Sequence, residues 1–397
     1  MVLLLRYSCK LISRVSFFVC ILCTAFRLNA VISHAESNNK TEMLAAYFDS
    51  PGEPDVLYVN QVPIPELEDN EVLVKVQASA INRADTLQRR GLYPIPPGAS
   101  PILGLEVSGT IEKVGASVGS AWKVGDKVMC LCNGGGNAEF VAVHFKHVMP
   151  MPANTNFLEA AAIPEVWLTA FQLLHFVGKL QPEDYVLIHA GASGVGTAAI
   201  QLVTLAKGKA IVTAGSEDKI KLALELGASA GFNYKETDFS EEVMKFTEGR
   251  GVNLILDCVG GVYWEMNVNC LAMDGRWVLY GLLGGRSVNG NLFLELLKKR
   301  ISLMATTLRT RTDEYKGQLV EAFSQQALSH FERGYLKPVM DSVFPLDQIS
   351  AAHEKMEANK NMGKIMIRVA KDNTDAIGVV DSINNINKEE TQIKAEL

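Results

Sequence analysis

The segment Gly191-Ala192-Ser193-Gly194-Val195-Gly196 follows directly on a short apolar run at residues 185–189. The apolar run predicts a strand, and the spacing after the segment predicts a helix over residues 195–206. A glycine-rich turn between a strand and a helix lets the backbone approach a pyrophosphate, whose charge the free N–H groups of the helix N-terminus stabilise. Ser193 stands where the usual G-x-G-x-x-G pattern has its second glycine, so a tight turn without a ligand is the alternative. The segment indicates a dinucleotide-binding unit.

Strands and helices alternate after this turn. Short apolar runs predict strands at residues 210–214, 253–257 and 276–280, and another near 301–304. Residues 218–226 predict a helix that ends at Gly227, a typical C-terminal stop. This alternation predicts an α/β fold with a doubly wound parallel sheet.

The regions before and after these alternating strands and helices have a different sequence pattern. Apolar runs at residues 56–59, 72–76 and 105–114 are separated by Pro, Gly and Asn, which predicts a β-rich region. Helical spacing begins near Glu159. The pattern also predicts a helix over residues 314–331 and a closing strand over residues 364–369. We expect both to belong to the β-rich domain. We expect a β-rich domain of residues 43–165 and 308–369, interrupted by a nucleotide-binding domain of residues 166–307.

The two ends of the chain differ from this body. Residues 1–35 contain no acidic residue and carry an apolar run at 15–26, which is too short and too interrupted for a membrane span. The pattern fits a secretory signal, an organellar transit peptide or an upstream extension equally well. Residues 371–397 are rich in Asn, Asp, Lys and Glu. We expect residues 1–42 to form an N-terminal extension with an open targeting role, and residues 370–397 to form a flexible tail.

Charge and composition narrow the class of function. The chain has a formal net charge of −6 and an isoelectric point near 5.8, so it lacks the excess of Lys and Arg that neutralises nucleic-acid phosphates. This argues against a nucleic-acid partner. The length of 397 residues predicts two domains. The seven cysteines show neither a disulfide framework nor a zinc ribbon, so we expect free thiols and a cytoplasmic body. A small-molecule enzyme fits these features.

The end of the second predicted strand selects the dinucleotide. That strand ends at Thr213-Ala214-Gly215-Ser216, where an NAD site usually has Asp or Glu to bind the ribose hydroxyls. A hydroxyl and the ammonium of Lys219 are available here to bind a 2'-phosphate, which favours NADPH. As the alternative, Glu217 and Asp218 cap the next helix and Lys219 is solvated.

Five motifs carry a family resemblance that spans about residues 43–369. They are AINRAD at 80–85, LGLEVSG at 103–109, AAIPEVWLTA at 161–170, HAGASGVG at 189–196 and NMGKI at 361–365. Together they resemble the zinc-free quinone oxidoreductase branch of the medium-chain dehydrogenase/reductase superfamily. The resemblance implies a GroES-like β-rich catalytic domain, a Rossmann domain that binds NADPH, hydride transfer to a small-molecule quinone, and a homodimer.

The resemblance also makes an absence informative. Zinc alcohol dehydrogenases of this superfamily use Cys, His and Cys as catalytic ligands, and the matching places here hold Asn82, Leu105 and about Glu165. Leucine cannot ligate a metal, so we expect no metal. A quinone is electrophilic without a Lewis acid, whereas alcohol oxidation is hard without one.

The resemblance implies roles for particular residues. Tyr93 aligns with a family tyrosine near the cleft and is a candidate donor to the developing oxyanion, as is Asn82. The alternatives are that Tyr93 only packs and that Asn82 caps the helix starting at Arg83. Glu106 and Glu165 are candidate acids, but we expect them to pair with Arg or Lys instead. The candidate cofactor-binding residues are Ser193, Gly194, Val195, Gly196, Gly215, Ser216, Lys219, Tyr234, Cys258, Val259, Gly281, Leu282, Leu283 and Asn361.

Three functions share these motifs. The first is an NADPH-dependent quinone oxidoreductase. The second is an alkenal or enone reductase of the same superfamily, because both enzymes reduce conjugated acceptors. The third is a protein that binds NADPH without catalysis.

Overall fold

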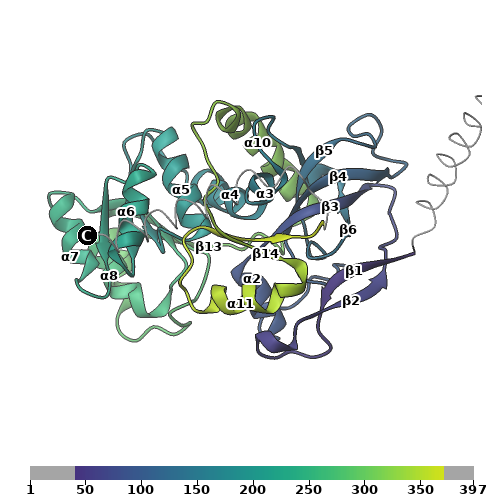
Figure 1. Cartoon of the computed structure of the whole chain (residues 1–397). Helices are drawn as coiled ribbons and strands as arrows, with labels where there is room; N and C mark the ends of the chain where they lie inside the picture. The colour runs from purple at the N-terminus through teal and green to yellow at the C-terminus, as the bar shows by residue number, and fades with distance from the viewer. Residues whose placement is uncertain (1–40, 371–397) are drawn as a thin grey trace, which may run out of the picture. The chain divides into compact units, whose positions relative to one another are not determined.

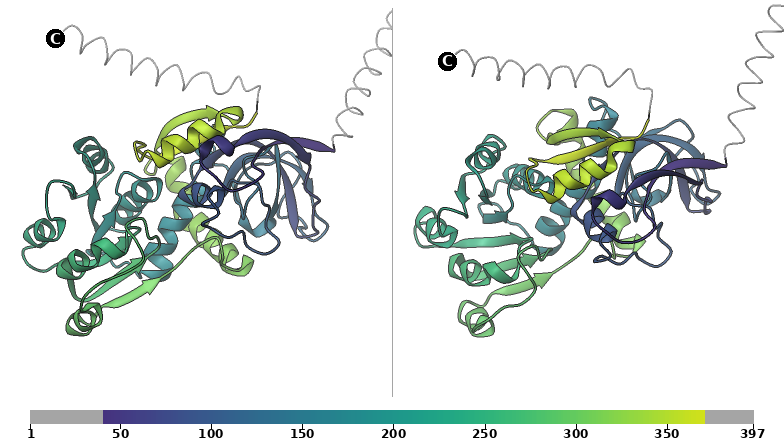
Figure 2. Two further views of the ribbon diagram at one scale, coloured as in Figure 1. Left: turned by 90° about the horizontal axis from the view of Figure 1, so that it is seen from below. Right: turned by 60° about the horizontal axis from the view of Figure 1, so that its bottom comes forward.

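A computed structural model of the chain describes residues 41–370. Its six-stranded sheet has the order β10-β9-β8-β11-β12-β13, and every pairing in it is parallel (Figures 1 and 2). The strands are β8 (Tyr185–His189), β9 (Lys209–Ala214), β10 (Ala230–Asn233), β11 (Val252–Asp257), β12 (Leu271–Leu279) and β13 (Ser302–Ala305). The predicted parallel Rossmann-type sheet is confirmed.

Alternating side chains bury both faces of this sheet. Val186 and Ile188 of β8 join one hydrophobic core, and Leu187 between them joins another. Successive strand residues point to opposite faces, so an unbroken apolar run fits a sheet covered on both sides. The first core contains residues of α4 (Pro164–Phe171), α5 (Gly194–Leu205), α6 (Glu217–Glu225) and α10 (Asp313–Glu332). The second contains residues of α7 (Phe239–Phe246), α8 (Trp264–Cys270) and α9 (Leu292–Lys299).

A seven-stranded sheet supplies the GroES-like part. Its order is β14-β15-β3-β4-β5-β7, and β6 also pairs with β3. Its strands are β3 (Glu71–Ile81), β4 (Glu106–Val114), β5 (Lys127–Leu131), β6 (Phe140–His144), β7 (Val148–Pro150), β14 (Met340–Pro345) and β15 (Lys364–Arg368). β15 pairs with β3, so the end of the described chain joins a sheet built mostly from its beginning.

Short helices follow strands of the seven-stranded sheet. They are α2 (Arg83–Arg89), α3 (Phe157–Ala161) and α11 (Ile349–Glu357), and α4 runs on into a π-helical turn at Gln172–Val177. The helical spacing from Glu159 onward belongs to two helices, because α4 starts anew at Pro164. Proline lacks the N–H that would continue α3 and is favoured in a first helical turn.

One predicted strand is wrong in its placement. Residues 56–59 do not form a strand of their own. A 3-10 turn at Pro54–Val56 precedes β2 (Tyr58–Pro63), which forms a two-stranded sheet with β1 (Glu42–Tyr47). The physical reason is Pro54, whose fixed φ favours the helical turn that ends at Val56, so the strand starts only at Tyr58.

The described chain divides into a main compact unit and a small one. The main unit contains residues 44–60 and 65–370, and the small one includes residues 41–43 and 61–64. The predicted division at residues 165 and 308 stays a prediction, and the predicted terminal segments lie almost wholly outside the described residues. Within residues 41–370, no helix combines the length and the apolar character that crossing a bilayer requires.

Candidate functional site

The predicted phosphate loop lies at the carboxyl edge of the parallel sheet. Ser193 is the N-cap of α5, and its Oγ accepts a hydrogen bond of 3.1 Å from the backbone N–H of Gly196. Gly194 and Val195 form the first turn of the helix. The backbone N–H groups of such a turn point outward from the helix end, where an anion is stabilised.

Close packing explains the glycines of this turn. A Cβ on Gly194 would lie 2.8 Å from Lys364 Cδ and 2.8 Å from Val166 Cγ1, and one on Gly196 would lie 2.4 Å from a backbone oxygen. Gly363 donates its N–H to the Ala192 carbonyl at 2.8 Å. The segment before β15 therefore lies directly against the phosphate loop.

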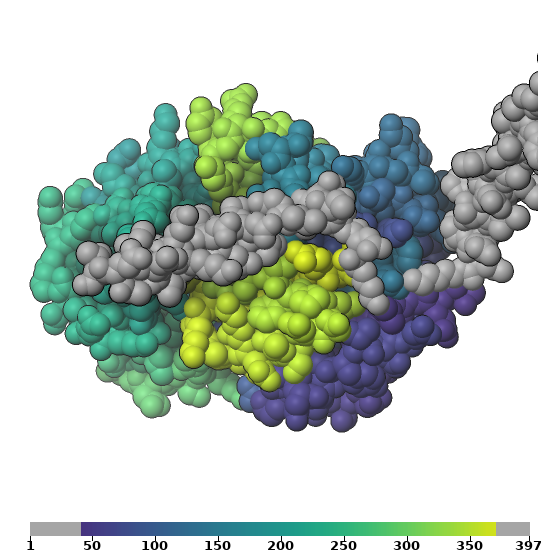
Figure 3. All heavy atoms as spheres, in the orientation of Figure 1, coloured from purple at the N-terminus to yellow at the C-terminus, as the bar shows by residue number. Residues whose placement is uncertain are grey.

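Asn361 belongs to the same segment. Its Nδ2 donates to the Gly363 carbonyl at 2.9 Å, which shapes the approach to β15. Figure 3 shows the yellow-green closing segment on the surface of the molecule, beside the purple part of the chain.

The residues predicted for the 2'-phosphate, and the predicted phosphate-side tyrosine, follow the neighbouring strands. Gly215 and Ser216 come directly after β9, and Tyr234 comes directly after β10. Lys219 is half-buried, and its Nζ donates to the Asn359 carbonyl at 2.7 Å. Burial lowers the pKa of Lys219, and the charge of Lys235 lowers it further. Two cations therefore stand close together at the end of β9.

The alternative, in which Glu217 and Asp218 cap the next helix and Lys219 is solvated, agrees with the structure only in part. Glu217 and Asp218 occupy the first turn of α6, as capping predicts, and both are exposed. Lys219, however, is not simply solvated, because it binds the Asn359 carbonyl.

The other half of the edge is organised by Asp257, the last residue of β11. Its Oδ1 accepts the N–H groups of Val259 at 2.7 Å and Gly260 at 3.0 Å, and its Oδ2 accepts Trp277 Nε1 at 2.9 Å. These bonds hold the Cys258-Val259 turn. Burial raises the pKa of the Cys258 thiol to about 12, so Cys258 is a neutral packing group.

The turn after β12 lies against that segment. Leu283 donates its N–H to the Cys258 carbonyl at 3.0 Å. A Cβ on Gly281 would lie 3.0 Å from the same carbonyl, so the two turns approach closely. Leu282 and Leu283 are 51% and 57% exposed, so both side chains are open to solvent at this edge of the sheet. The structure thus brings every predicted cofactor residue to one edge of the sheet.

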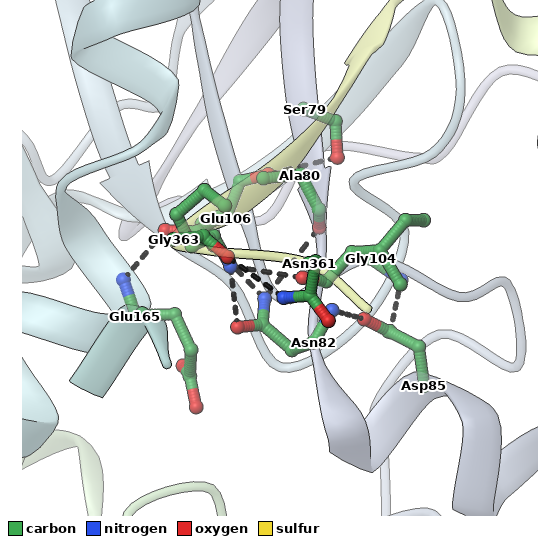
Figure 4. A network of polar contacts seen from close by, with 12 residues as sticks. Ser79, Ala80, Asn82, Asp85, Gly104, Glu106, Glu165, Asn361 and Gly363 are labelled. Carbon is green, nitrogen blue, oxygen red and sulfur yellow. Dashed lines mark hydrogen bonds and ion pairs between the residues drawn. The ribbon is translucent and has the colours of Figure 1, made fainter. Parts of the chain in front are cut away.

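A buried polar network adjoins the phosphate loop (Figure 4). Lys364 Nζ lies 2.7 Å from Glu106 Oε1 and donates to Asn82 Oδ1 at 2.7 Å. Asn82 Nδ2 in turn donates to Glu106 Oε1 at 2.9 Å. Lys364 is also the residue whose stem packs against Gly194. The network therefore joins the predicted catalytic Asn82 to the predicted cofactor loop.

The capping role expected for Asn82 is also present. Asn82 is the N-cap of α2, and its backbone N–H donates to Asp85 Oδ2 at 2.8 Å. Asp85 Oδ1 accepts the N–H of Gly104 at 2.9 Å. Burial raises the pKa of Asp85 to about 6, although both N–H bonds pull it down. The bond to Asp85 uses the backbone N–H of Asn82 and the network uses its carboxamide, so these contacts are compatible.

Tyr93 lies in a second polar group. Its ring centroid is 5.7 Å from the guanidinium of Arg309, whose Nη1 donates to Gln88 at 2.7 Å in the same helix α2 that Asn82 caps. Burial raises the pKa of the Tyr93 phenol, Glu165 adds to the rise, and Arg309 opposes it. The phenol is therefore neutral at pH 7 and able to donate a hydrogen bond.

The two glutamates differ in their partners. Glu106 forms the ion pair with Lys364, which confirms its expected role. The expectation for Glu165 is wrong: within residues 41–370 it forms no ion pair, because Lys364 is already engaged by Glu106 and Asn82. Glu165 donates only its backbone N–H, to Glu106 Oε2 at 2.8 Å.

The absence of a metal stays a prediction. Leu105, at one of the places that match zinc ligands, is buried. In the described part of the chain, no three His, Cys, Asp or Glu side chains are grouped so that they can hold a metal ion.

Sequence reasoning missed three residues of the site: Lys364, Arg309 and Asp257. Lys364 lies in the quoted motif at residues 361–365, and the strand before the Cys258 turn ends at Asp257, so both had a local signal. Arg309 lies in a loop that carries no pattern of its own.

We predict that Lys364→Met lowers the free energy of unfolding by about 3–5 kcal/mol, because it leaves Glu106 buried and unpaired. Adding Glu106→Gln removes that charge and should recover about 2 kcal/mol or more of the loss. Urea unfolding followed by tryptophan fluorescence measures both variants, with the exposed Lys360→Met as the control. If the double variant is no more stable than Lys364→Met, the ion pair is not the reason for the loss.

Comparison with known proteins agrees with this geometry. The family model for "Alcohol dehydrogenase GroES-like domain" matches residues 68–153, and that for "Zinc-binding dehydrogenase" matches residues 194–325. The quinone oxidoreductase of Rattus norvegicus is 31% identical over 319 residues, which cover 80% of this chain and 94% of the relative.

Solved structures are similar as well. The Escherichia coli quinone oxidoreductase complexed with NADPH has a TM-score of 0.74 at 29% identity and covers 82% of this chain and 100% of its own. CurK enoyl reductase has a TM-score of 0.73 at 30% identity and covers 83% and 99%. The chain belongs to the quinone oxidoreductase family of the medium-chain dehydrogenase/reductase superfamily.

Proposed function

We propose that this protein is an NADPH-dependent quinone reductase that resembles the tumour-suppressor-inducible NADPH quinone oxidoreductase. The proposal rests on one observation: the phosphate loop, the residues around Lys219 and the Asn82 network lie at one edge of the sheet. Ligands of open α/β sheets bind at the carboxyl ends of the strands. The relatives named quinone oxidoreductase support the substrate class.

The residues present fit NADPH. The first turn of α5 offers free N–H groups to the pyrophosphate, and Gly194 and Gly196 leave room for a close approach. Lys219 and Lys235 supply positive charge at the end of β9, where a 2'-phosphate would lie. When bound, the cofactor supplies the hydride, and the protein supplies orientation and electrostatics.

The chain's own groups then act on the quinone. The neutral Tyr93 phenol donates a hydrogen bond to the oxygen that gains negative charge, and the nearby Arg309 guanidinium stabilises that charge. Asn82 is held by Lys364 and Glu106, so its carboxamide has one fixed orientation. A quinone is already electrophilic, so these donors are sufficient for the proposed reaction.

An enone reductase is the second candidate. CurK enoyl reductase is as similar in structure as the quinone reductases are, and conjugated carbonyl compounds need the same hydride and oxyanion stabilisation. A protein that binds NADPH without turnover is the third.

We also propose a homodimer. β13 is an edge strand of the six-stranded sheet, and Leu303 in it is 40% exposed. Phe293 and Leu297 of the adjacent α9 are 80% and 77% exposed. An apolar edge of this kind is typical of an interface between copies. Light scattering should give twice the mass of the chain, whereas the mass of one chain would contradict the dimer.

For the body of the protein we propose a cytoplasmic location. Its free cysteines Cys130, Cys132, Cys258 and Cys270 are all buried, which suits a reducing compartment. N-terminal sequencing of the native protein separates this from secretory or organellar processing.

The choice between the three functions depends on turnover. We predict that NADPH oxidation is faster with an ortho-quinone than with a 2-alkenal, because the quinone needs less activation. Initial rates at matched concentrations measure this. The opposite order would favour the enone reductase, and NADPH binding without oxidation by either compound would favour the non-catalytic protein.

We predict that Lys219→Ala raises the KM for NADPH about tenfold and leaves the KM for NADH within about twofold, because a charge-assisted bond to the 2'-phosphate is lost. Lys221→Ala is the matched control, since Lys221 is exposed on the same helix α6. Equal changes for both cofactors would contradict a 2'-phosphate site at Lys219.

A further inference from the structure

Glu165 combines a fixed backbone with an unpaired carboxyl group. It is the second residue of α4, directly after Pro164, and its N–H is bound by Glu106. Figure 4 shows its side chain pointing away from the Asn82 and Glu106 network. Within the described residues 41–370, its carboxyl group makes neither a hydrogen bond nor an ion pair, and the residue is partly exposed. A carboxyl held in this way is free to act on a ligand.

Several elements place titratable groups around Glu165. The carboxylates are Glu106 of β4 and Asp85 of α2, and the cations are Lys364 of β15 and Lys316 of α10. The Tyr93 phenol and the Arg309 guanidinium also interact with it, as does the buried Cys132 thiol. Glu165 therefore belongs to the same group as the predicted donor Tyr93.

This environment favours the protonated acid. Burial raises the pKa of Glu165 to about 8, and Glu106 raises it further against the opposing effect of Lys364. The Lys364 ammonium contacts Glu106 and Asn82 instead of Glu165. A carboxyl group that is mostly protonated at pH 7 and has a pKa near that pH is suited to act as a general acid. The pKa of the Tyr93 phenol is raised, so the phenol keeps its proton and donates a hydrogen bond.

We propose that Glu165 is the proton donor that completes reduction of the substrate. The inference rests on the proposed quinone reductase function. The quinone accepts a hydride with its two electrons, and the cofactor is oxidised to NADP⁺. The O–H bond of Glu165 breaks, a new O–H bond forms on the anionic substrate oxygen, and the neutral hydroquinone results. The Glu165 carboxylate then takes a proton from water.

The kinetic test compares the wild type with Glu165→Gln, which keeps the size of the side chain but carries no transferable acid proton. We expect kcat/KM of the wild type with an ortho-quinone to fall as pH rises through about 8, because the acid is lost. In Glu165→Gln the rate at pH 7 should drop about 100-fold or more, and this fall with pH should disappear. Glu165→Asp should keep part of the rate and its pH dependence.

Two further measurements separate this role from a structural one. Infrared difference spectra of the cofactor-free protein should show a protonated carboxyl band that is lost as pH rises through about 8 and is absent in Glu165→Gln. The exposed Glu225→Gln, at the end of α6, is the matched control and should keep both the band and the rate.

The outcomes distinguish the two proposals. A wild type that oxidises NADPH with neither a quinone nor an alkenal defeats the proposed function, whatever the infrared band shows. If the wild type reduces the quinone and Glu165→Gln has the same rate and pH profile, only the proposed role of Glu165 is overturned. Absence of the carboxyl band from the wild type at pH 7 also overturns it.

Discussion

The buried ion pair between Lys364 and Glu106 is the interaction on which the site depends. Its two atoms are 2.7 Å apart, and both side chains are almost fully removed from solvent. Breaking such a pair by removing one partner is costly, because a charge is left unpaired in a medium of low polarity. Lys364 comes from the closing strand β15 and Glu106 from β4, so the pair ties the end of the described chain to an early strand of the same sheet.

Other parts of the site take their positions from this pair. Lys364 fixes the Asn82 carboxamide and packs its stem against Gly194 of the phosphate loop. Glu106 uses its second oxygen to hold the start of α4, and with it the backbone of Glu165. Because Lys364 is occupied in this way, Glu165 is left without a cation of its own. The structural pair and the proposed acid are thus two consequences of one arrangement.

The fold was largely predictable because its signals are local. The glycine turn at residues 191–196 and the alternation after it depend on neighbouring residues, and both appear in the structure. The strand predicted at residues 56–59 begins two residues late, at Tyr58, because the helical turn Pro54–Val56 precedes it. The helical stretch after Glu159 became two helices because Pro164 begins the second.

The site was less predictable because its contacts are distant in sequence. Lys364 and Asn82 are 282 residues apart, and only the folded sheet brings them together. The same holds for Arg309, which reaches Gln88 across 221 residues. Residue type predicted that Glu106 and Glu165 would each pair with a cation. In the fold, however, Lys364 is paired with Glu106, and Lys316 and Arg309 are bound to other partners.

A crystal structure of the NADPH complex tests the central claim most directly. We expect the 2'-phosphate within hydrogen-bond distance of Lys219, the pyrophosphate at the first turn of α5, and the nicotinamide facing the side of the site that contains Tyr93 and Glu165. A 2'-phosphate away from both Lys219 and Lys235, or a nicotinamide remote from Tyr93 and Glu165, would contradict the account.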